Sequence, residues 1–296
     1  AGYTLTFVLN PQGFDGTIAT AEDIQKFTEN PAGTFKLTAD IDMAGVEFKP
    51  IQNFTGTLDG QGHFIRNVSY DNKDTDKAAF FAPFGGEFIK NVGFEGFNII
   101  GNADVAAVVG ETTANGVISN VVVCNSYIQG RDHVASICGK INNDATIVNC
   151  LANAQIYTRS YQAAGIVGCG ISGLIEKCVF SGTVTALGSA TNLSGIISLL
   201  DNNGVSVKNC LGAAAYYTNA NKQDGTIVNK YDRECGLENN YITDYSLING
   251  VNVPGGPADS QAGALATAEE VRSQAWCEGT LGLDFTNDWK FLAGSE

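Results

Sequence analysis

Short apolar runs recur along the chain at a nearly constant interval. One run has two small residues, two apolar residues and a further small residue, and its five copies begin at residues 78, 106, 135, 164 and 194, which are 28, 29, 29 and 30 residues apart. A second run, mostly of the form apolar-x-Asn-apolar, follows each copy of the first. Its copies are Ile89–Val92, Ile118–Val121, Ile147–Cys150, Ile175–Cys178 and Val207–Cys210, and we assign Ile65–Val68 and Leu237–Tyr241 to the same line. Two patterns that keep step over five repeats indicate an array of structural repeats.

The content of each repeat predicts β structure. Every repeat holds two or three short β-rich runs divided by Gly, Asn and Asp, and none has the 3.6-residue periodicity of a helix. A β-sandwich need not repeat its sequence, whereas a coil stacks equivalent residues about 4.8 Å apart. We therefore predict an all-β fold, a single-stranded right-handed parallel β-helix (a solenoid) with coils of about 28–31 residues. The handedness follows from the crossover preference of parallel strands.

The two ends carry helical signals. Thr20 is placed to cap a short helix over Thr20–Phe27, and Thr267 with Glu270 forms a capping-box pattern. A β-helix needs its open ends covered, so we expect short helical caps at Thr20–Phe27 and Thr267–Phe291. The prediction is one continuous domain, with an N-terminal cap and first strands at 1–52, β-helix repeats at 53–249, and a C-terminal loop and capping segment at 250–296.

Eight cysteines, in a chain long enough for its own core, allow either disulfides or buried thiols. Cys150, Cys178 and Cys210 occupy one repeat position, where earlier repeats carry Val92, Val121 and, on our alignment, Val68. Cysteine in place of valine behaves as a small buried hydrophobe. An internal stack of free thiols is therefore favoured over disulfides.

Asparagine also recurs at one repeat position. This position predicts an asparagine ladder at a turn, whose amide groups bond to backbone groups of neighbouring coils. A ligand groove lined by asparagine is the alternative. The residues concerned are Asn67, Asn91, Asn120, Asn149 and Asn209.

The charge of the chain narrows the classes of partner. With 17 basic and 31 acidic residues the formal net charge is −14, which argues against nucleic acid because phosphate contacts need clustered Lys and Arg. No apolar run has the length of a membrane span, so we expect no membrane insertion of this chain. Neutral or cationic ligands and divalent ions remain allowed.

Acidic residues that could act in catalysis are few, and most fall at different positions of the repeat. Asp104 and Asp132 nearly share a repeat phase, and we expect them on a solvated edge. The segment Asp59–His63 could hold an acid/base pair but reads more simply as a Gly-rich turn, and the acidic loop Asp71–Asp76 lacks calcium-loop spacing. No sequence motif of a zinc, nucleotide or serine-hydrolase site occurs. We predict no catalytic residue, no metal site and no cofactor.

One edge is richer in recognition residues than the rest. Arg131, Asp132 and His133 should lie beside Arg159 and Tyr161 of the following coil. Arginine and tyrosine are favoured at binding sites, so we hypothesise that this edge contacts a glycan or a protein. The alternative is a set of turn residues that only keep the edge hydrated.

Several segments resemble a known family. The block Ala164–Gly168 with Leu174–Cys178 is similar to the GLUG-motif repeat, and the order of Ile18–Ile24, Phe35–Asp42 and Phe54–His63 resembles the start of GLUG-repeat, pectin-lyase-like β-helix proteins of Bacteroidetes. The resemblance implies a secreted or surface-anchored bacterial protein that is adhesin-like. It brings no characterised catalytic site.

These observations favour a non-enzymatic, adhesin-like binding module, extracellular or on the outer cell surface and lipid-anchored in a longer precursor. Its expected partner is a host or dietary glycan, or a surface protein, and we expect a monomer. The alternatives are a β-helix carbohydrate-active enzyme (polysaccharide lyase or glycoside hydrolase) and a structural spacer. The question of enzymatic activity stays open at this point, because the dispersed carboxylates only weigh against it.

Overall fold

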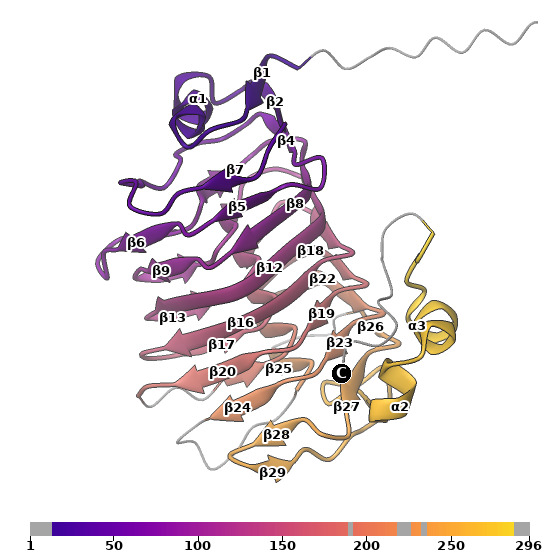
Figure 1. Ribbon diagram of the computed structural model, residues 1–296. Coiled ribbons are helices and arrows are strands. Elements are labelled where there is room, and N and C mark those ends of the chain that lie inside the picture. The colour runs from indigo at the N-terminus through magenta and orange to yellow at the C-terminus, as the bar shows by residue number, and fades with distance from the viewer. Residues whose placement is uncertain (1–13, 189–191, 218–225, 232–235, 287–296) are drawn as a thin grey trace, which may run out of the picture.

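The computed structural model describes residues 14–188, 192–217, 226–231 and 236–286. The chain winds as a parallel β-solenoid, and Figure 1 shows its stacked coils with the N-terminal helix at one end and the C-terminal helices beside the last coils. The predicted all-β parallel helix with short helices towards both ends of the chain is confirmed, although the C-terminal helix packs on the outer face of the last coils, against Val179, Leu211 and Tyr241, and not over their open end. The period is confirmed as well, because Val109 lies opposite Cys138, Cys138 opposite Val167, and Val167 opposite Ile197.

Each coil contributes strands to the same series of ladders. The first ladder holds β7 (Phe81–Phe84), β11 (Val109–Thr112), β14 (Cys138–Ile141), β18 (Val167–Glu176), β22 (Ile197–Lys208) and β25 (Val228–Tyr231). The second holds β4 (Thr57–Asp59), β8 (Phe88–Glu95), β12 (Val117–Gly130), β15 (Ala145–Val148) and β26 (Gly236–Glu238), together with the later parts of β18 and β22. Long strands such as β12 therefore bend through more than one ladder.

Three further ladders complete the coils. The third holds β5 (Phe64–Arg66), β16 (Leu151–Thr158), β19 (Val179–Phe180), β23 (Leu211–Gly212), β27 (Tyr241–Thr243) and β30 (Ala264–Ala266). The fourth holds β6 (Ser69–Asp71), β9 (Asn98–Ile100), β20 (Thr183–Ala186), β24 (Ala215–Tyr217) and β28 (Leu247–Ile248), with the ends of β12 and β16. A separate small sheet holds β10 (Ala103–Val105), β13 (Asp132–Val134), β17 (Gln162–Ala164) and β21 (Asn192–Ser194).

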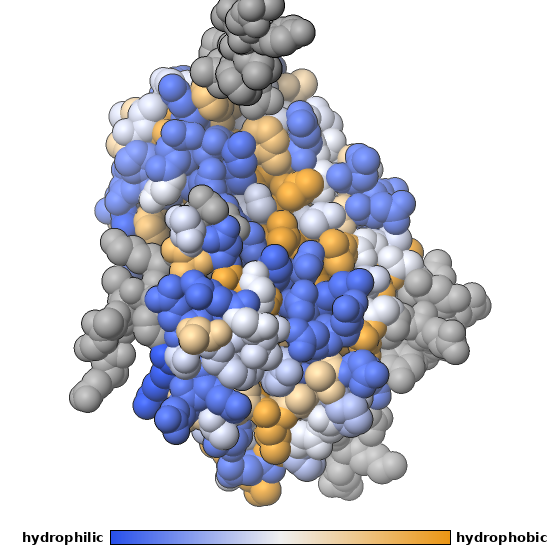
Figure 2. Space-filling model, turned by 90° about the vertical axis from the view of Figure 1, so that its right-hand side faces the viewer, coloured by the Kyte–Doolittle hydropathy of each residue, from blue (hydrophilic) through white to orange (hydrophobic). Residues whose placement is uncertain are grey.

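The core is a continuous column of inward-facing side chains. Valine and isoleucine fill it through the middle coils, where alternate residues of each strand are buried. At the N-terminal end phenylalanine replaces them, and Phe27 contacts Phe54 and Phe81 edge to face, each at 5.5 Å between ring centroids. These rings close the first coils under β1 (Gly16–Ile18), β2 (Thr34–Leu37) and β3 (Ile41–Asp42). The outer surface is mixed, and Figure 2 shows a narrow, broken apolar stripe between polar side chains.

The helical ends differ in how they are capped. At the N-terminus the helix begins later than predicted, as a 3₁₀ turn over Glu22–Gln25 followed by α1 (Lys26–Glu29). Thr20 is not its N-cap, because the Asp23 carboxylate accepts the backbone N–H groups of Ala19 and Thr20 instead.

At the other end the predicted capping box is present. Thr267 Oγ1 accepts from the Glu270 N–H, and the Glu270 carboxylate accepts from the Thr267 N–H, at the start of α2 (Ala268–Val271). The helix α3 (Gln274–Leu281) follows, and Cys277 and Leu281 pack against Leu211. The part of the expected cap after Thr286 lies outside the described residues. Within the described residues no helix is long and apolar enough to span a membrane.

The first coil departs from the predicted alignment. Leu58 lies opposite Ile89, whereas Ile65 lies opposite Phe94, one ladder further on. The reason is the tight turn between β4 and β5, where Gln61 and Gly62 both have positive φ and the chain reaches the next ladder early. Consequently Asn67 and Val68 do not belong to the asparagine and cysteine columns, and that part of the prediction is wrong.

The remaining asparagine column forms a ladder. Asn91, Asn120, Asn149 and Asn209 all adopt left-handed backbone conformation with φ of 53–54°, which asparagine tolerates better than most residues. The Asn120 amide donates to Asn91 Oδ1 at 3.1 Å. The Asn209 amide donates to a Glu176 carboxylate oxygen at 3.3 Å. These amides therefore bond to side chains of the preceding coil, where we expected bonds to backbone groups.

The cysteine column lies inside, as predicted for Cys150, Cys178 and Cys210, and the seven cysteines in the described ranges are free thiols. Each thiol of the column points to a carbonyl of the preceding coil, and Cys178 Sγ lies 3.7 Å from the Ile147 oxygen. Asn240 takes the next position of the column. Its amide donates to the Val207 carbonyl at 2.8 Å and its oxygen accepts from the Cys210 N–H at 3.1 Å.

Candidate ligand-binding face

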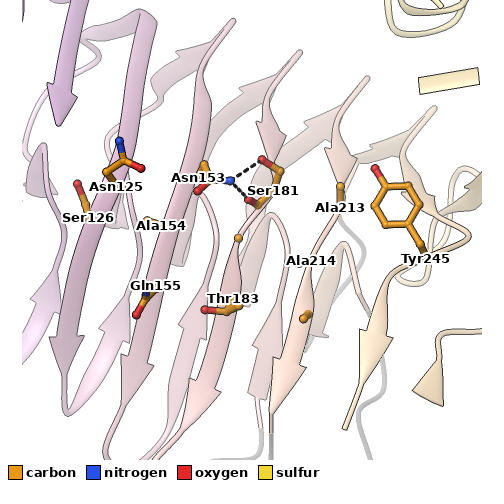
Figure 3. Close-up of a pocket in the computed structure, with 12 residues that line it drawn as sticks. Asn125, Ser126, Asn153, Ala154, Gln155, Ser181, Thr183, Ala213, Ala214 and Tyr245 are labelled. Atoms are coloured by element: carbon orange, nitrogen blue, oxygen red, sulfur yellow. Dashed lines mark hydrogen bonds between the residues drawn. The ribbon is translucent and has the colours of Figure 1, made fainter. Parts of the chain in front are cut away.

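A groove of about 630 Å³ runs across successive coils on the outer surface. Figure 3 shows its lining residues in order along the stack, from Asn125 on β12 to Tyr245 beyond β27. The lining is made of amide, hydroxyl and small side chains with one aromatic ring. The twelve residues are Asn125, Ser126, Asn153, Ala154, Gln155, Ser181, Gly182, Thr183, Ala213, Ala214, Ala215 and Tyr245.

The strand register explains why this surface is hollow. Tyr127 lies opposite Gln155, Gln155 opposite Thr183, and Thr183 opposite Ala215, so four coils place one outward residue each in a column. The side chains become smaller along this column, from tyrosine to alanine. Because the backbone spacing is constant, the shrinking side chains leave space above Thr183 and Ala215.

Hydrogen bonds hold part of the groove floor in place. The Asn153 amide donates to Ser181 Oγ at 3.2 Å and to the Ser181 carbonyl of the next coil. Gln155 itself is exposed, and its oxygen accepts from the Tyr157 hydroxyl at 3.3 Å. Gln155 and Thr183 are register neighbours, so their polar side chains lie on adjacent coils of the groove (Figure 3).

Two tyrosines form a ledge beside the groove, where Tyr127 is the register neighbour of Gln155 and Tyr157 follows Gln155 by two residues on β16. The rings of Tyr127 and Tyr157 stack with 4.8 Å between centroids and an interplanar angle of 30°. The Tyr127 hydroxyl donates to Gln129 Oε1 at 2.6 Å, which fixes the ring orientation. Burial, with Tyr157 nearby, raises the pKa of Tyr127, so its hydroxyl stays neutral and able to donate at physiological pH.

The groove is uncharged. None of its twelve lining residues is acidic or basic, so it offers neither the paired carboxylates of a glycoside hydrolase nor a basic anion site. It can supply amide donors and acceptors, hydroxyl groups and aromatic faces. This arrangement suits recognition of a neutral polar ligand.

The edge predicted from the sequence divides into two parts. Arg131, Arg159 and Tyr161 lie together at a turn, where the Ser160 and Tyr161 N–H groups donate to the Arg131 carbonyl. Tyr161 is 58% exposed. The Arg159 guanidinium is engaged in the fold, since it donates to the Gly101 carbonyl at 2.7 Å and to the Lys73 carbonyl at 3.3 Å. As a ligand site this edge stays a prediction.

Asp132 and His133 turn away from that edge into a half-buried cluster. His133 Nδ1 lies 2.7 Å from Asp104 Oδ1, and His133 Nε2 lies 3.8 Å from Asp132 Oδ1. The register sets Asp104 opposite His133, because Ala103 pairs with Asp132. The expectation that Asp104 and Asp132 lie on a solvated edge is therefore wrong, since their side chains are only 14% and 18% exposed.

The ionisation of His133 is set by opposing effects. Burial lowers its pKa, but the hydrogen bond to Asp104, the contact with the Cys169 thiol and the charge of Asp132 together raise the pKa to about 10. His133 is consequently an imidazolium at neutral pH. Sequence reasoning noticed His133 but missed Cys169, which lies 36 residues further along the chain, on the next coil.

The two other candidate motifs have structural roles. Asp59 is buried and accepts from the Gln61 N–H and the Asn91 amide, while His63 Nδ1 pairs with Asp40 at 3.2 Å. Asp59 and His63 therefore do not form an acid/base pair. In the acidic loop, Asp76 accepts from the Asn102 amide at 2.7 Å. Among the described residues no three His, Cys, Asp or Glu side chains are arranged to hold a metal ion.

Two sequence comparisons match parts of this chain. Residues 20–125 match the model of the N-terminal region of the M26 IgA1-specific metallo-endopeptidases. Halomucin of Haloquadratum walsbyi is 30% identical over 143 residues, a match that covers 43% of this chain and 2% of Halomucin. The chain thus corresponds to a small part of that relative.

A solved structure resembles most of this chain. The crystal structure of a candidate immunoglobulin A1 protease from Bacteroides ovatus is similar with a TM-score of 0.71 and 21% identity, over 89% of this chain and 86% of that one. At this identity the likeness establishes the fold. The predicted GLUG resemblance stays a prediction.

Proposed function

We propose that this chain is a non-enzymatic glycan-binding module of a larger secreted or cell-surface protein, and that the uncharged groove with its Tyr127 and Tyr157 ledge is the binding face. The observation that carries the proposal is the composition of the groove, where amide and hydroxyl groups alternate with small residues beside stacked rings. Sugar hydroxyl groups pair with amides and hydroxyls, and the apolar faces of sugar rings pack on aromatic side chains.

The direction of the groove favours a linear chain. Its lining residues repeat once per coil at the spacing of adjacent strands, about 4.8 Å. A glycan that runs along the solenoid axis meets equivalent polar groups at regular intervals. The net charge of −14 opposes strongly acidic polysaccharides, so a neutral glycan is the better fit.

The comparisons support a role as one part of a longer protein. The matched model describes a region at the N-terminus of a larger peptidase, and the chain corresponds to 2% of Halomucin. We infer an extracellular or cell-surface location and an adhesin-like role from the family resemblance and from these matches. A surface protein as the partner, held at the edge with Arg131 and Tyr161, is the second candidate.

A glycan array followed by calorimetry of the best ligand tests the proposal. Gln155→Ala and Tyr157→Ala should each weaken binding by about tenfold, the loss expected for one good polar or aromatic contact. The matched control is Gln52→Ala, an exposed glutamine near the N-terminal end, which should leave the affinity unchanged. Loss of binding with Arg131→Ala but not with Gln155→Ala would transfer the function to the edge.

The enzyme alternative is tested on the same ligands. A polysaccharide lyase or glycoside hydrolase releases new reducing ends, whereas a binding module retains the glycan unchanged. We expect no increase in reducing sugar over the array hits. An increase that disappears in a groove variant would overturn the non-enzymatic proposal.

A further inference from the structure

Cys169 differs from the cysteines of the interior column. It lies on β18 opposite Lys140, which lies opposite Glu111 on β11, and these two neighbours are partly exposed. The position therefore faces outward, and Cys169 does not belong to the apolar core cluster. The residue is 1% exposed, so side chains cover an outward-facing thiol.

The groups that surround this thiol come from three consecutive coils. Asp104 on β10 and His133 on β13 occupy equivalent positions with φ of 55° and 49°, and Cys169 follows on the next coil. His133 Nδ1 lies 2.7 Å from Asp104 Oδ1, and Cys169 is among the neighbours that raise the pKa of His133. Gly168, directly before Cys169, packs against the His133 backbone. The order carboxylate, imidazole, thiol is the arrangement that activates a sulfur nucleophile.

Glycines allow this close approach. A Cβ atom at Gly168 would lie 2.4 Å from the His133 carbonyl carbon, and one at Gly139 would lie 2.3 Å from that of Asp104. The residue before Cys169 therefore has to be glycine for the strand to pack against the His133 turn. The fold holds His133 against Cys169 through backbone contacts as well as through side chains.

The charged groups around the cluster are of both signs. Asp104 and Asp132 face His133, Lys140 is the register neighbour of Cys169, and Glu111 lies 3.5 Å from the Lys140 ammonium group. Lys77 adds a further cation, with its nitrogen 2.6 Å from Glu111. The two carboxylates next to His133 keep the ring protonated, so a cation adjoins the sulfur.

We propose that Cys169 is a reactive thiol, activated by His133 and with Asp104 as the positioning residue, and that hydrogen peroxide and similarly small peroxides oxidise it to a sulfenic acid. The sulfur, with its proton given up to solvent, attacks one peroxide oxygen; an S–O bond forms and the O–O bond breaks. Sulfur is oxidised and the peroxide is reduced. The leaving hydroxide takes the imidazolium proton and departs as water, and His133 regains a proton from solvent.

The size of the oxidant fits the burial of the site. A thiol that is 1% exposed under a cover of side chains admits peroxide more easily than a bulky disulfide. Cys124 provides an internal comparison, because it is more exposed and has no histidine beside it. Burial and the charge of Glu95 raise the pKa of Cys124, which slows its reaction.

The test treats the folded protein with limiting hydrogen peroxide, traps sulfenic acid with dimedone and quantifies each cysteine peptide by mass spectrometry. We expect the trapped fraction at Cys169 to exceed that at Cys124 by about tenfold at pH 7. His133→Asn should lower labelling of Cys169 by about tenfold and leave Cys124 unchanged. Asp104→Asn should give a smaller loss, and Cys169→Ser should abolish the signal.

Two results would overturn the proposal. One is wild-type protein in which Cys124 reacts as fast as Cys169, a comparison that needs no variant. The other is a His133→Asn protein that keeps the wild-type thermal midpoint and the wild-type labelling of Cys169. If His133→Asn lowers the thermal midpoint, its labelling no longer tests the proposal. The proposal is then judged by the labelling of Cys169 in Asp104→Asn and by the comparison of Cys169 with Cys124 in the wild type.

Discussion

His133 and Asp104 lie one coil apart and are joined by a 2.7 Å contact between Nδ1 and Oδ1, with the two residues in left-handed turn conformations. The sequence separates them by 29 positions, and only the stacking of coils makes them partners. This pair forms a charged contact that is largely shielded from water, next to the buried core residues Val105 and Val134.

The pair predicts a stability change at alkaline pH. The folded-state pKa of His133 is raised to about 10, whereas an unfolded histidine titrates near about 6.5. The protonated ring therefore stabilises the fold fully below about pH 6.5, and this contribution is lost as the pH rises towards 10. The difference in free energy of unfolding between wild type and His133→Asn, from urea titrations at pH 6, 8 and 10, should shrink as the pH increases. A constant difference would contradict the assignment.

The Asp40 and Arg66 pair predicts a change at acid pH. Arg66 bonds to Asp40 at 2.7 Å and to Glu95 at 2.7 Å. The hydrogen bonds that Asp40 accepts from Arg66 and from the Phe64 N–H lower the pKa of Asp40 to about 2. Stability from Asp40 is present above about pH 4 and is lost as the pH falls through 2. The thermal midpoint of Asp40→Asn, scanned from pH 5 to 2, should fall less steeply than that of the wild type. Because the pair is partly exposed, added salt should reduce the difference.

Substitution by valine should reduce stability by different amounts at two positions of the interior column. Cys178→Val should cost less than about 1.5 kcal/mol, since the change conserves volume and earlier coils carry valine at this position. Asn240→Val should cost about 1–3 kcal/mol, because it leaves the Cys210 N–H and the Val207 carbonyl without their buried partner. Guanidinium unfolding of both variants measures the contrast. Equal costs would show that the column tolerates any residue of similar size.

Two glycines provide a matched pair. Gly168→Ala should destabilise the protein by about 3 kcal/mol, because the new Cβ would lie 2.4 Å from the backbone of His133. Gly279 lies within α3 with no atom near its added Cβ, and Gly279→Ala should stabilise by up to about 1 kcal/mol. Differential scanning calorimetry of both variants checks the sign. Unchanged stability for Gly168→Ala would mean that β18 shifts away from the His133 turn.

Much of the fold followed from the sequence alone. The 29-residue period, the parallel coils, the buried position of Cys178 and the capping box at Thr267 were all predictable. The reason is that a solenoid converts sequence repetition directly into spatial stacking, so equivalent residues become neighbours. The period did not predict the first coil, because Ile65 imitates the repeat pattern while a tight turn before it moves the strand to another ladder.

The candidate sites depended on the tertiary structure. The groove arises where outward side chains shrink from Tyr127 to Ala215 over four coils, a trend that is visible only once the register of each strand is known. Likewise, repeat phase indicated that Asp104 and Asp132 lie on neighbouring coils, but not that Asp104 lies opposite His133 or that Cys169 lies near this pair. The sequence by itself determined which residues stack beyond the first coil, because stacking there follows the period. The tertiary structure decided which side chains meet across the turns, because turn lengths and left-handed residues set that geometry.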